Sequence, residues 1–285
     1  MSELRIATRA SRLAMAQAKE VADMLSEAYP ETEVTLIEVS TTGDRDRTTS
    51  VTTLTEVGAF VRSVQHVVID GLADVAVHSC KDLPVDGPSE LTAFYPRRER
   101  PWDVLCGHHL EELPQGARVG TGSPRRAAQL RRIRPDIEVA DIRGNVDTRL
   151  AKMHSGEYDA VVLAEAGLRR LGREDEIDYV FDLVEMVPAP GQAVLAVEVL
   201  AGGKAAEIVS GVDDPTTRAV VETERALLGL TRAGCRSALG ALATVDTGTI
   251  DITGFVEDGA GARFGQAHGP RPDDAARALK EELGL

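Results

Sequence analysis

The feature that most constrains the fold is an alternation of predicted strands and helices, which stops at a charged segment and then starts again. Short apolar runs predict buried strands, and apolar residues three or four positions apart predict helices. Before the charged segment, strands are expected at 4–8, 33–39, 74–77 and 91–95, with helices at 11–29 and around 60–68. After it, strands are expected at 118–121, 137–141 and 159–163, with helices at 124–132, at 146–155 and up to about 171. Strands that alternate with helices form mainly parallel sheets, so the sequence predicts two α/β domains.

The remaining segments predict how the chain is divided. Residues 96–102 carry charges and two prolines, as is typical of a crossover, and residues 188–192 resemble a return hinge. The apolar run at 193–200 is expected to return to the first sheet. From residue 215 a long helix, two alternating strands and a last helix predict a small α+β domain. The expected domains are 1–96 with 193–211, 97–192, and 212–285.

Composition argues against several classes of function. The formal net charge is −14, and aromatic residues make up 4% of the chain. Nucleic acids and membrane surfaces attract basic faces, and single-stranded nucleic acids need aromatic platforms, so neither partner is expected. Arginine accounts for 27 of the 32 basic residues. Acid-rich and lysine-poor surfaces stay soluble when salt screens charge, so we expect a high-salt cytoplasm.

The cysteines and the hydropathy indicate the compartment. Three cysteines, at 80, 106 and 235, are too few and too scattered for a disulfide framework or a metal site, so no metal is expected. An odd number of cysteines fits a reducing compartment. Neither a secretory signal nor an apolar stretch of membrane-spanning length is visible. We therefore expect a soluble cytoplasmic protein.

Within this acidic chain, residues 118–149 form a basic segment with eight arginines and four acidic residues. Two of its turns follow a predicted strand and open a predicted helix. These turns contain Ser123, Arg125, Arg126, Arg143 and Arg149. Helix N-termini attract anions, and arginine binds carboxylates through paired donors, so the turns predict sites for a ligand with several carboxylates or phosphates. A solvated face or surface ion pairs is the simpler interpretation for three others, Arg131, Arg132 and Arg134.

Two turns in the first predicted domain are also candidates. Lys81 and Asp82 follow a buried strand, at the end where α/β sheets usually bind ligands. Lys81 is suited to hold an anion, and Asp82 to act as a general acid–base or to face a developing positive charge. A surface ion pair is the alternative. Arg9 and Ser11 lie at the first strand-to-helix turn, where Ser11 is also placed to cap the helix.

Cys235 lies in a small turn after a long predicted helix. Gly234 precedes it, and Arg232 and Arg236 are close in sequence and favour a thiolate. A nucleophilic sulfur near fixed positive charges suggests a covalent tether for an anionic group. A structural or incidental cysteine is the alternative.

The ordered set of motifs resembles the porphobilinogen deaminase family, also called hydroxymethylbilane synthases. The similarity covers nearly the whole chain, and the order of the motifs makes it specific although each motif alone is weak. The matching segments are 5–11, 74–84, 121–126, 143–149, 167–172 and 234–235. The family fold has two periplasmic-binding-protein-like α/β domains and a small C-terminal α+β domain that carries the cysteine.

The resemblance implies a function and a cofactor. Members of this family join four porphobilinogen units into a linear tetrapyrrole with release of ammonia, on a dipyrromethane primer bound covalently through a cysteine, here Cys235. Each pyrrole carries acetate and propionate groups, which fits the arginine clusters. A cationic azafulvene forms when ammonia leaves, and Asp82 is implied as the catalytic carboxylate.

The resemblance also implies roles for the other candidates. Lys81, Ser123, Arg125 and Arg126 are implied to hold the cofactor. The residues implied to hold the substrate or the growing chain are Arg9, Ser11, Arg143, Arg149 and Arg170. Family members are usually monomeric, and a downstream uroporphyrinogen-III synthase is implied as a recipient of the product.

Several positions depart from the family pattern. Ala193 stands where the hinge usually has glycine, and Gly122 stands where serine is common. The segment 55–60 lacks a usual lysine. These departures leave open a family member that acts only as a scaffold. A two-lobed protein that binds small anions is another alternative, because it would share the fold and an arginine-lined cleft. Such a binding protein needs neither Cys235 nor a third domain.

Overall fold

The computed structural model describes residues 3–39, 53–231 and 238–285. The chain divides into two compact units, Met1–Arg98 with Val194–Arg218, and Glu99–Ala193 with Ala219–Leu285. The three-domain boundaries expected from the sequence stay a prediction. In the part of the chain that the structure describes, no helix has the length and apolar character needed to cross a membrane.

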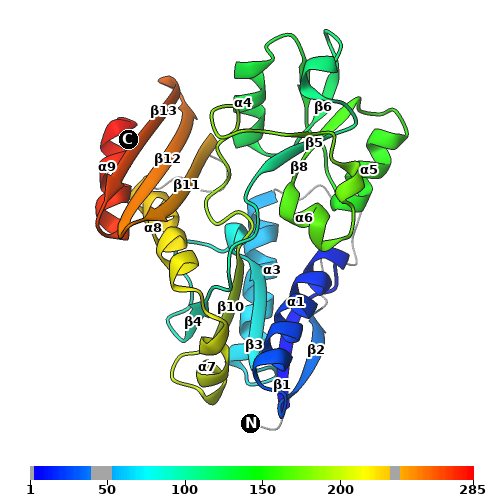
Figure 1. The fold of residues 1–285 in the computed structure, drawn as a ribbon. Coiled ribbons are helices and arrows are strands. Elements are labelled where there is room, and N and C mark those ends of the chain that lie inside the picture. The colour runs from blue at the N-terminus through cyan, green and yellow to red at the C-terminus, as the bar shows by residue number, and fades with distance from the viewer. Residues whose placement is uncertain (1–2, 40–52, 232–237) are drawn as a thin grey trace. The chain divides into compact units, whose positions relative to one another are not determined.

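The first unit contains a five-stranded sheet in the order β2-β1-β3-β10-β4 (Figure 1). Its strands are β1 (Glu3–Arg9), β2 (Glu33–Val39), β3 (Val75–Ser79), β4 (Leu91–Phe94) and β10 (Leu195–Leu200). Strand β1 pairs in parallel with β2 and β3, whereas β10 lies antiparallel between β3 and β4. The expected return of the apolar run to this sheet is confirmed, and its direction makes the sheet mixed.

Helices cover both faces of this sheet. They are α1 (Arg12–Ala28), α3 (Thr53–Ile69) and α7 (Lys204–Val209), with short 3-10 turns at η1 (Cys80–Asp82) and η4 (Ser210–Val212). Side chains of a strand alternate between faces. Leu4 and Ile6 accordingly pack in one cluster with Val21 of α1, and Ala7 packs in another with Val64 of α3. The sequence predicted α1 and α3 but not α7.

The second unit contains a five-stranded sheet in the order β7-β6-β8-β5-β9. Its strands are β5 (Asp103–Cys106), β6 (Arg118–Gly120), β7 (Glu138–Ala140), β8 (Ala160–Ala164) and β9 (Tyr179–Val180). Strand β6 is parallel to β7 and β8, and β5 is antiparallel to β8 and β9. The two sheets therefore share one topology, in which β5 takes the place of β10. Neither β5 nor β9 was predicted.

The helices of this sheet are α4 (Pro124–Ile133), α5 (Val146–His154) and α6 (Glu165–Arg170), with 3-10 turns at η2 (Leu110–Glu112) and η3 (Glu174–Glu176). Leu130 of α4 packs with Val119 on one face of the sheet, and Leu150 of α5 packs with Val161 on the other. The sequence predicted all three helices.

The C-terminal part is a small α+β structure. Its antiparallel strands β11 (Ala238–Asp246), β12 (Thr249–Asp258) and β13 (Gly261–Gly269) pack with α8 (Pro215–Thr231) and α9 (Pro272–Glu282). Leu227, Ile252 and Leu279 are buried in its core. Strand β13 was not predicted. The two α/β sheets and this α+β part confirm the predicted fold class.

Candidate functional site

The two predicted strand-to-helix turns of the second unit are confirmed. The side chain of Ser123 accepts a hydrogen bond from the backbone of Arg126, and Pro124 occupies the first turn of α4. Asn145 caps α5 in the same way, because its Oδ1 accepts from the backbone N of Thr148 at 2.9 Å. Both helices thus begin with capped N-termini, which attract negative charge.

These turns lie side by side at the carboxyl edge of the sheet. Strands β6 and β7 are parallel neighbours, and the backbone N of Thr121 donates to the carbonyl of Ala140 at 2.9 Å. Gly144 has a φ of +117°, in the left-handed region that favours glycine. The second turn therefore depends on glycine.

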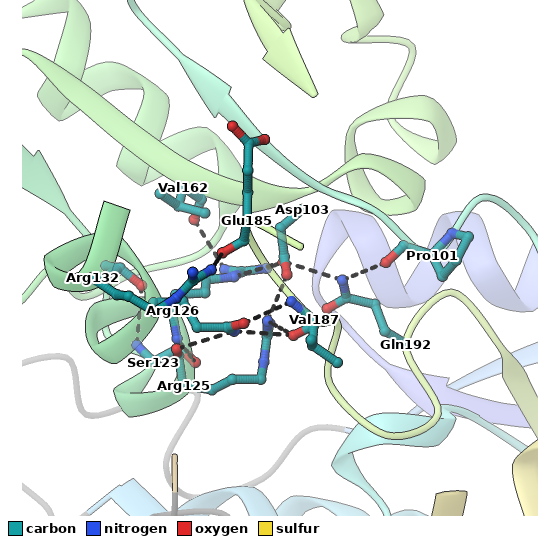
Figure 2. A network of polar contacts seen from close by, with 12 residues as sticks. Pro101, Asp103, Ser123, Arg125, Arg126, Arg132, Val162, Glu185, Val187 and Gln192 are labelled. Carbon is teal, nitrogen blue, oxygen red and sulfur yellow. Dashed lines mark hydrogen bonds and ion pairs between the residues drawn. The ribbon is translucent and has the colours of Figure 1, made fainter. Parts of the chain in front are cut away.

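Arg125 and Arg126 lie in a buried network around Asp103 (Figure 2). Asp103 Oδ2 accepts from Nη1 of Arg125 at 2.6 Å, and Oδ1 accepts from Nε of Arg126 at 2.8 Å. The same oxygen Oδ1 also accepts from Nε2 of Gln192 at 3.1 Å. Arg125 and Arg126, which were predicted to bind a ligand, thus also bind a carboxylate within the protein. Asp103 was not predicted from the sequence, because its ion pairs join residues more than 20 positions apart.

Each arginine of the network has a second anchor. Nη1 of Arg125 donates to the carbonyl of Val187 at 2.7 Å, and Nη1 of Arg126 donates to the carbonyl of Val162 at 3.0 Å. Nε of Arg125 is buried and has no hydrogen-bond partner among the residues that the structure describes. Burial lowers the pKa of Arg125, and the nearby charge of Arg126 lowers it further. This site therefore holds more positive charge than its carboxylate neutralises.

Arg149 adds to that excess of positive charge. Burial lowers its pKa to about 10, and the charges of Arg126 and Arg143 contribute in the same direction. Its Nε donates to the carbonyl of Gly144 at 2.8 Å. Arg143 is exposed and pairs with Asp141 at 2.8 Å. The structure thus brings together the predicted residues of the two turns as one electropositive cluster.

Arg170 lies at the end of α6, and its Nη2 is 3.5 Å from the carbonyl oxygen of Ala193. Ala193 has a φ of 67°, which is unusual for a residue other than glycine. The position of Arg170 at the carboxyl side of β8 places it at the same sheet edge as the two turns. Its contact with a substrate stays a prediction.

The first unit places Arg9 at the end of β1. Its guanidinium lies 4.1 Å from the centre of the Phe60 ring, a cation–π contact that was not predicted from the sequence. Nε of Arg9 is buried and, in the described part of the chain, has no hydrogen-bond partner. Ser11 caps α1, since its Oγ accepts from the backbone N of Ala14 at 3.3 Å. The capping role expected for Ser11 is thus confirmed, and a ligand contact stays a prediction.

Lys81 and Asp82 lie on η1, directly after β3. Asp82 is exposed and Lys81 is half-buried. Because β1 and β3 are parallel neighbours, Arg9, Lys81 and Asp82 lie at one edge of the first sheet. Cys80, between the strand and Lys81, is buried.

Strand β3, which precedes η1, contacts a buried cluster of polar side chains. Glu198 of β10 accepts from Nε2 of Gln65 at 2.9 Å and lies 3.2 Å from Nε2 of His78. All three side chains are buried. This cluster ties α3, β3 and β10 together beneath the segment that carries Lys81 and Asp82.

The predicted cofactor cysteine, Cys235, lies outside the described residues. Cys80 and Cys106 are both buried. Burial raises the pKa of Cys106 to about 12. Neither of these two thiols is suited to act as a nucleophile.

Comparisons with known proteins identify the family. Residues 4–207 match the model for porphobilinogen deaminase, dipyromethane cofactor binding domain. The chain is 46% identical to a porphobilinogen deaminase of Acidothermus cellulolyticus, over 97% of this chain and 86% of the relative. It is 43% identical to that of Thermus thermophilus, over 98% of this chain and 92% of the relative.

Two solved structures that resemble this chain are distant from it in sequence. The sulphonate-binding protein SsuA of Escherichia coli aligns with a TM-score of 0.40 and 16% identity, over 81% of this chain and 71% of SsuA. The BenM effector binding domain with its effector benzoate aligns with a TM-score of 0.42 and 14% identity, over 75% of this chain and 95% of that domain. The fold class rests on the two sheets described above.

The sequence relatives place the chain among the enzymes of tetrapyrrole synthesis. It belongs to the porphobilinogen deaminase family and contains the dipyrromethane cofactor binding domain of that family. The described residues fit such a cofactor. Buried guanidinium nitrogens of Arg9 and Arg125 lack hydrogen-bond partners within the described ranges, and carboxylates are the acceptors that arginine prefers.

Proposed function

We infer that this protein is a transferase that joins four porphobilinogen units, with release of ammonia, into hydroxymethylbilane on a dipyrromethane primer. The observation that carries this inference is the electropositive cluster of the second unit. Burial lowers the pKa of Arg149 to about 10, and the nearby charges of Arg126 and Arg143 contribute to this lowering. A folded protein tolerates such repulsion when an anionic ligand compensates it. A chain of pyrroles with acetate and propionate groups is such a ligand.

The cluster supports a division of roles. The side chains proposed to hold cofactor carboxylates are Lys81, Ser123, Arg125 and Arg126. The side chains that hold the incoming unit or the growing chain are Arg9, Ser11, Arg143, Arg149 and Arg170. The dipyrromethane, when bound to Cys235 by a thioether, supplies the terminal pyrrole carbon to which the next unit is added.

Asp82 is the catalytic carboxylate of this proposal. Its side chain is exposed at the carboxyl edge of the first sheet, where a ligand can reach it. Loss of ammonia from porphobilinogen leaves a positive charge on the pyrrole unit. A carboxylate near the pyrrole nitrogen stabilises that charge and accepts or returns the proton. The Asp82→Asn variant is expected to lose turnover and to keep its affinity for porphobilinogen.

We further propose that the protein acts as a monomer and passes its product to a uroporphyrinogen-III synthase. The linear product carries the same carboxylates as the substrate, so the recipient needs a basic site of its own. Mass photometry with and without such a synthase tests both statements.

The first test is the intact mass of the purified, denatured protein beside its Cys235→Ser variant. A mass excess that matches two linked pyrroles, present in the parent and absent in the variant, supports the proposal. The Cys80→Ala variant is the matched control, because Cys80 is buried and should not affect the attachment. A parent that gains no such mass even after incubation with porphobilinogen contradicts it.

A further inference from the structure

Asp103 begins strand β5 and is fully buried. Strand β5 continues with Val104, Leu105 and Cys106, all of which are buried in apolar clusters. A buried carboxylate is costly unless charged or hydrogen-bonding partners compensate it. Asp103 lies in an otherwise apolar strand, so its partners must compensate the cost of burying its charge.

Its two oxygens are divided between two arginines. Oδ2 accepts from Nη1 of Arg125 at 2.6 Å. Oδ1 accepts from Nε of Arg126 at 2.8 Å and lies 2.7 Å from its Nη2, so Arg126 presents two nitrogens to this oxygen. Figure 2 shows the carboxylate between the two guanidinium groups. A single side chain thus sets the spacing of both arginines.

Other contacts fix the carboxylate and the arginines against rotation. Gln192 donates from Nε2 to Asp103 and, at 2.7 Å, to the carbonyl of Pro101. Carbonyl groups of Val187 and Val162 accept from Arg125 and Arg126. Each guanidinium is therefore held at two points.

The charge of the network is not balanced. Two arginines face one carboxylate, and the charge of Arg149 lies close enough to Arg126 for the two to repel each other. Full neutralisation of Arg125 and Arg126 would require a second carboxylate. The arrangement instead orients the arginines and leaves positive charge for a ligand.

We propose that Asp103 is a positioning residue that holds Arg125 and Arg126 in the geometry that receives the cofactor carboxylates. This proposal rests on the proposed function. Asp103 itself is buried behind the arginines and does not touch the ligand.

Positioning and simple charge attraction predict opposite results. The Asp103→Asn variant keeps the shape of the side chain and raises the local positive charge by one. If the arginines act only through their charge, this variant binds a carboxylate ligand more tightly and accepts the primer faster. If Asp103 positions them, loading slows although the site is more positive, because misplacement of binding groups is costly.

The experiment uses the unloaded full chain, made in a host that does not produce porphobilinogen. Porphobilinogen is added, and intact mass is followed over time to give the rate of covalent loading. Asp103→Asn is expected to load roughly tenfold more slowly or worse. In the Cys235→Ser background, calorimetry with porphobilinogen should show weaker binding.

Leu105→Ala is the matched control for stability. Leu105 lies on the same strand, two residues further on, and is fully buried in the apolar core. This control is expected to unfold more easily and still load at the parental rate. Loading of folded Asp103→Asn at the parental rate or faster overturns the proposal.

Gln192→Met provides a second variant if Asp103→Asn does not fold. It is nearly isosteric and removes one donor to Oδ1, so loading should slow by roughly threefold or more. A parental rate in this variant overturns the proposal. A parent chain that never loads contradicts the proposed function instead, so the two failures are distinguishable.

Discussion

Replacement of Arg149 by methionine should stabilise the unloaded protein while weakening its affinity for porphobilinogen. Arg149 is partly buried near Arg126 and Arg143, and its pKa falls from the ordinary value for arginine to about 10. The folded state therefore disfavours the charged form. Methionine keeps most of the apolar stem of the side chain and removes the charge.

The magnitude follows from that pKa. A tenfold change in a proton equilibrium corresponds to about 1.4 kcal/mol, so the charged side chain costs at most about 3.5 kcal/mol in the folded state. The variant also loses the hydrogen bond from Nε to the carbonyl of Gly144, which contributes about 1 kcal/mol. The net expectation is a free energy of unfolding that is higher by about 1–2 kcal/mol.

Urea denaturation of the unloaded parent and of Arg149→Met measures this difference. Arg131→Met is the control, because Arg131 is an exposed arginine on α4, and its replacement should change the free energy of unfolding by less than about 0.5 kcal/mol. A decrease in stability for Arg149→Met would contradict this prediction, because it would mean that the charge is compensated within the protein.

The difference in the free energy of unfolding between Arg149→Met and the parent should depend on pH. Below about pH 10, Arg149 is charged in both the folded and the unfolded parent, and the full cost is present. As the pH rises through about 10, the folded parent releases this proton before the unfolded chain does. The stability advantage of the variant should therefore shrink above that pH. An advantage that grows with pH would contradict the lowered pKa.

Three further outcomes are expected. Ala193→Gly should raise the free energy of unfolding by about 0.5–1 kcal/mol, because φ of 67° strains alanine, and a decrease in urea stability would contradict this. Gly144→Ala should lower it by roughly 2 kcal/mol, since a Cβ would lie 2.6 Å from Cγ2 of Thr148, and unchanged thermal unfolding would exclude that clash. At pH 8 a thiol reagent should leave Cys80 and Cys106 of the folded protein unlabelled, and peptide mapping that finds label on either would show the burial to be wrong.

Local signals explain what could be predicted from the sequence. Ser11 and Ser123 each precede a helix whose apolar spacing and first residues are visible within a short window, and both cap it as expected. The strand-to-helix turns of the candidate site were found for the same reason. Parallel pairing of β6 and β7 then brings those turns together, so the location of the electropositive cluster followed from local patterns.

The missed features depend on contacts between distant residues or on weak local signals. Strand β13 contains glycine and alanine where β-branched residues are usual, so its sequence did not predict a strand. Strand β5 begins with a carboxylate, and only its arginine partners on α4 explain why Asp103 is buried there. Phe60 beneath Arg9 is likewise a contact between separate elements. Local sequence patterns thus predicted the arginines of the site. The residues that contact those arginines, Asp103 and Phe60, became visible only in the structure.

The shared topology of the two sheets has a consequence for synthesis of the chain. All described strands of the second sheet lie between residues 103 and 180, whereas β4 of the first sheet pairs with β10, at Leu195–Leu200. A ribosome therefore releases the whole second sheet before the first can be completed. Until β10 emerges, β3 and β4 have unpaired edges, which attract other strands. The N-terminal half therefore exposes strand edges throughout the time in which the second sheet is synthesised.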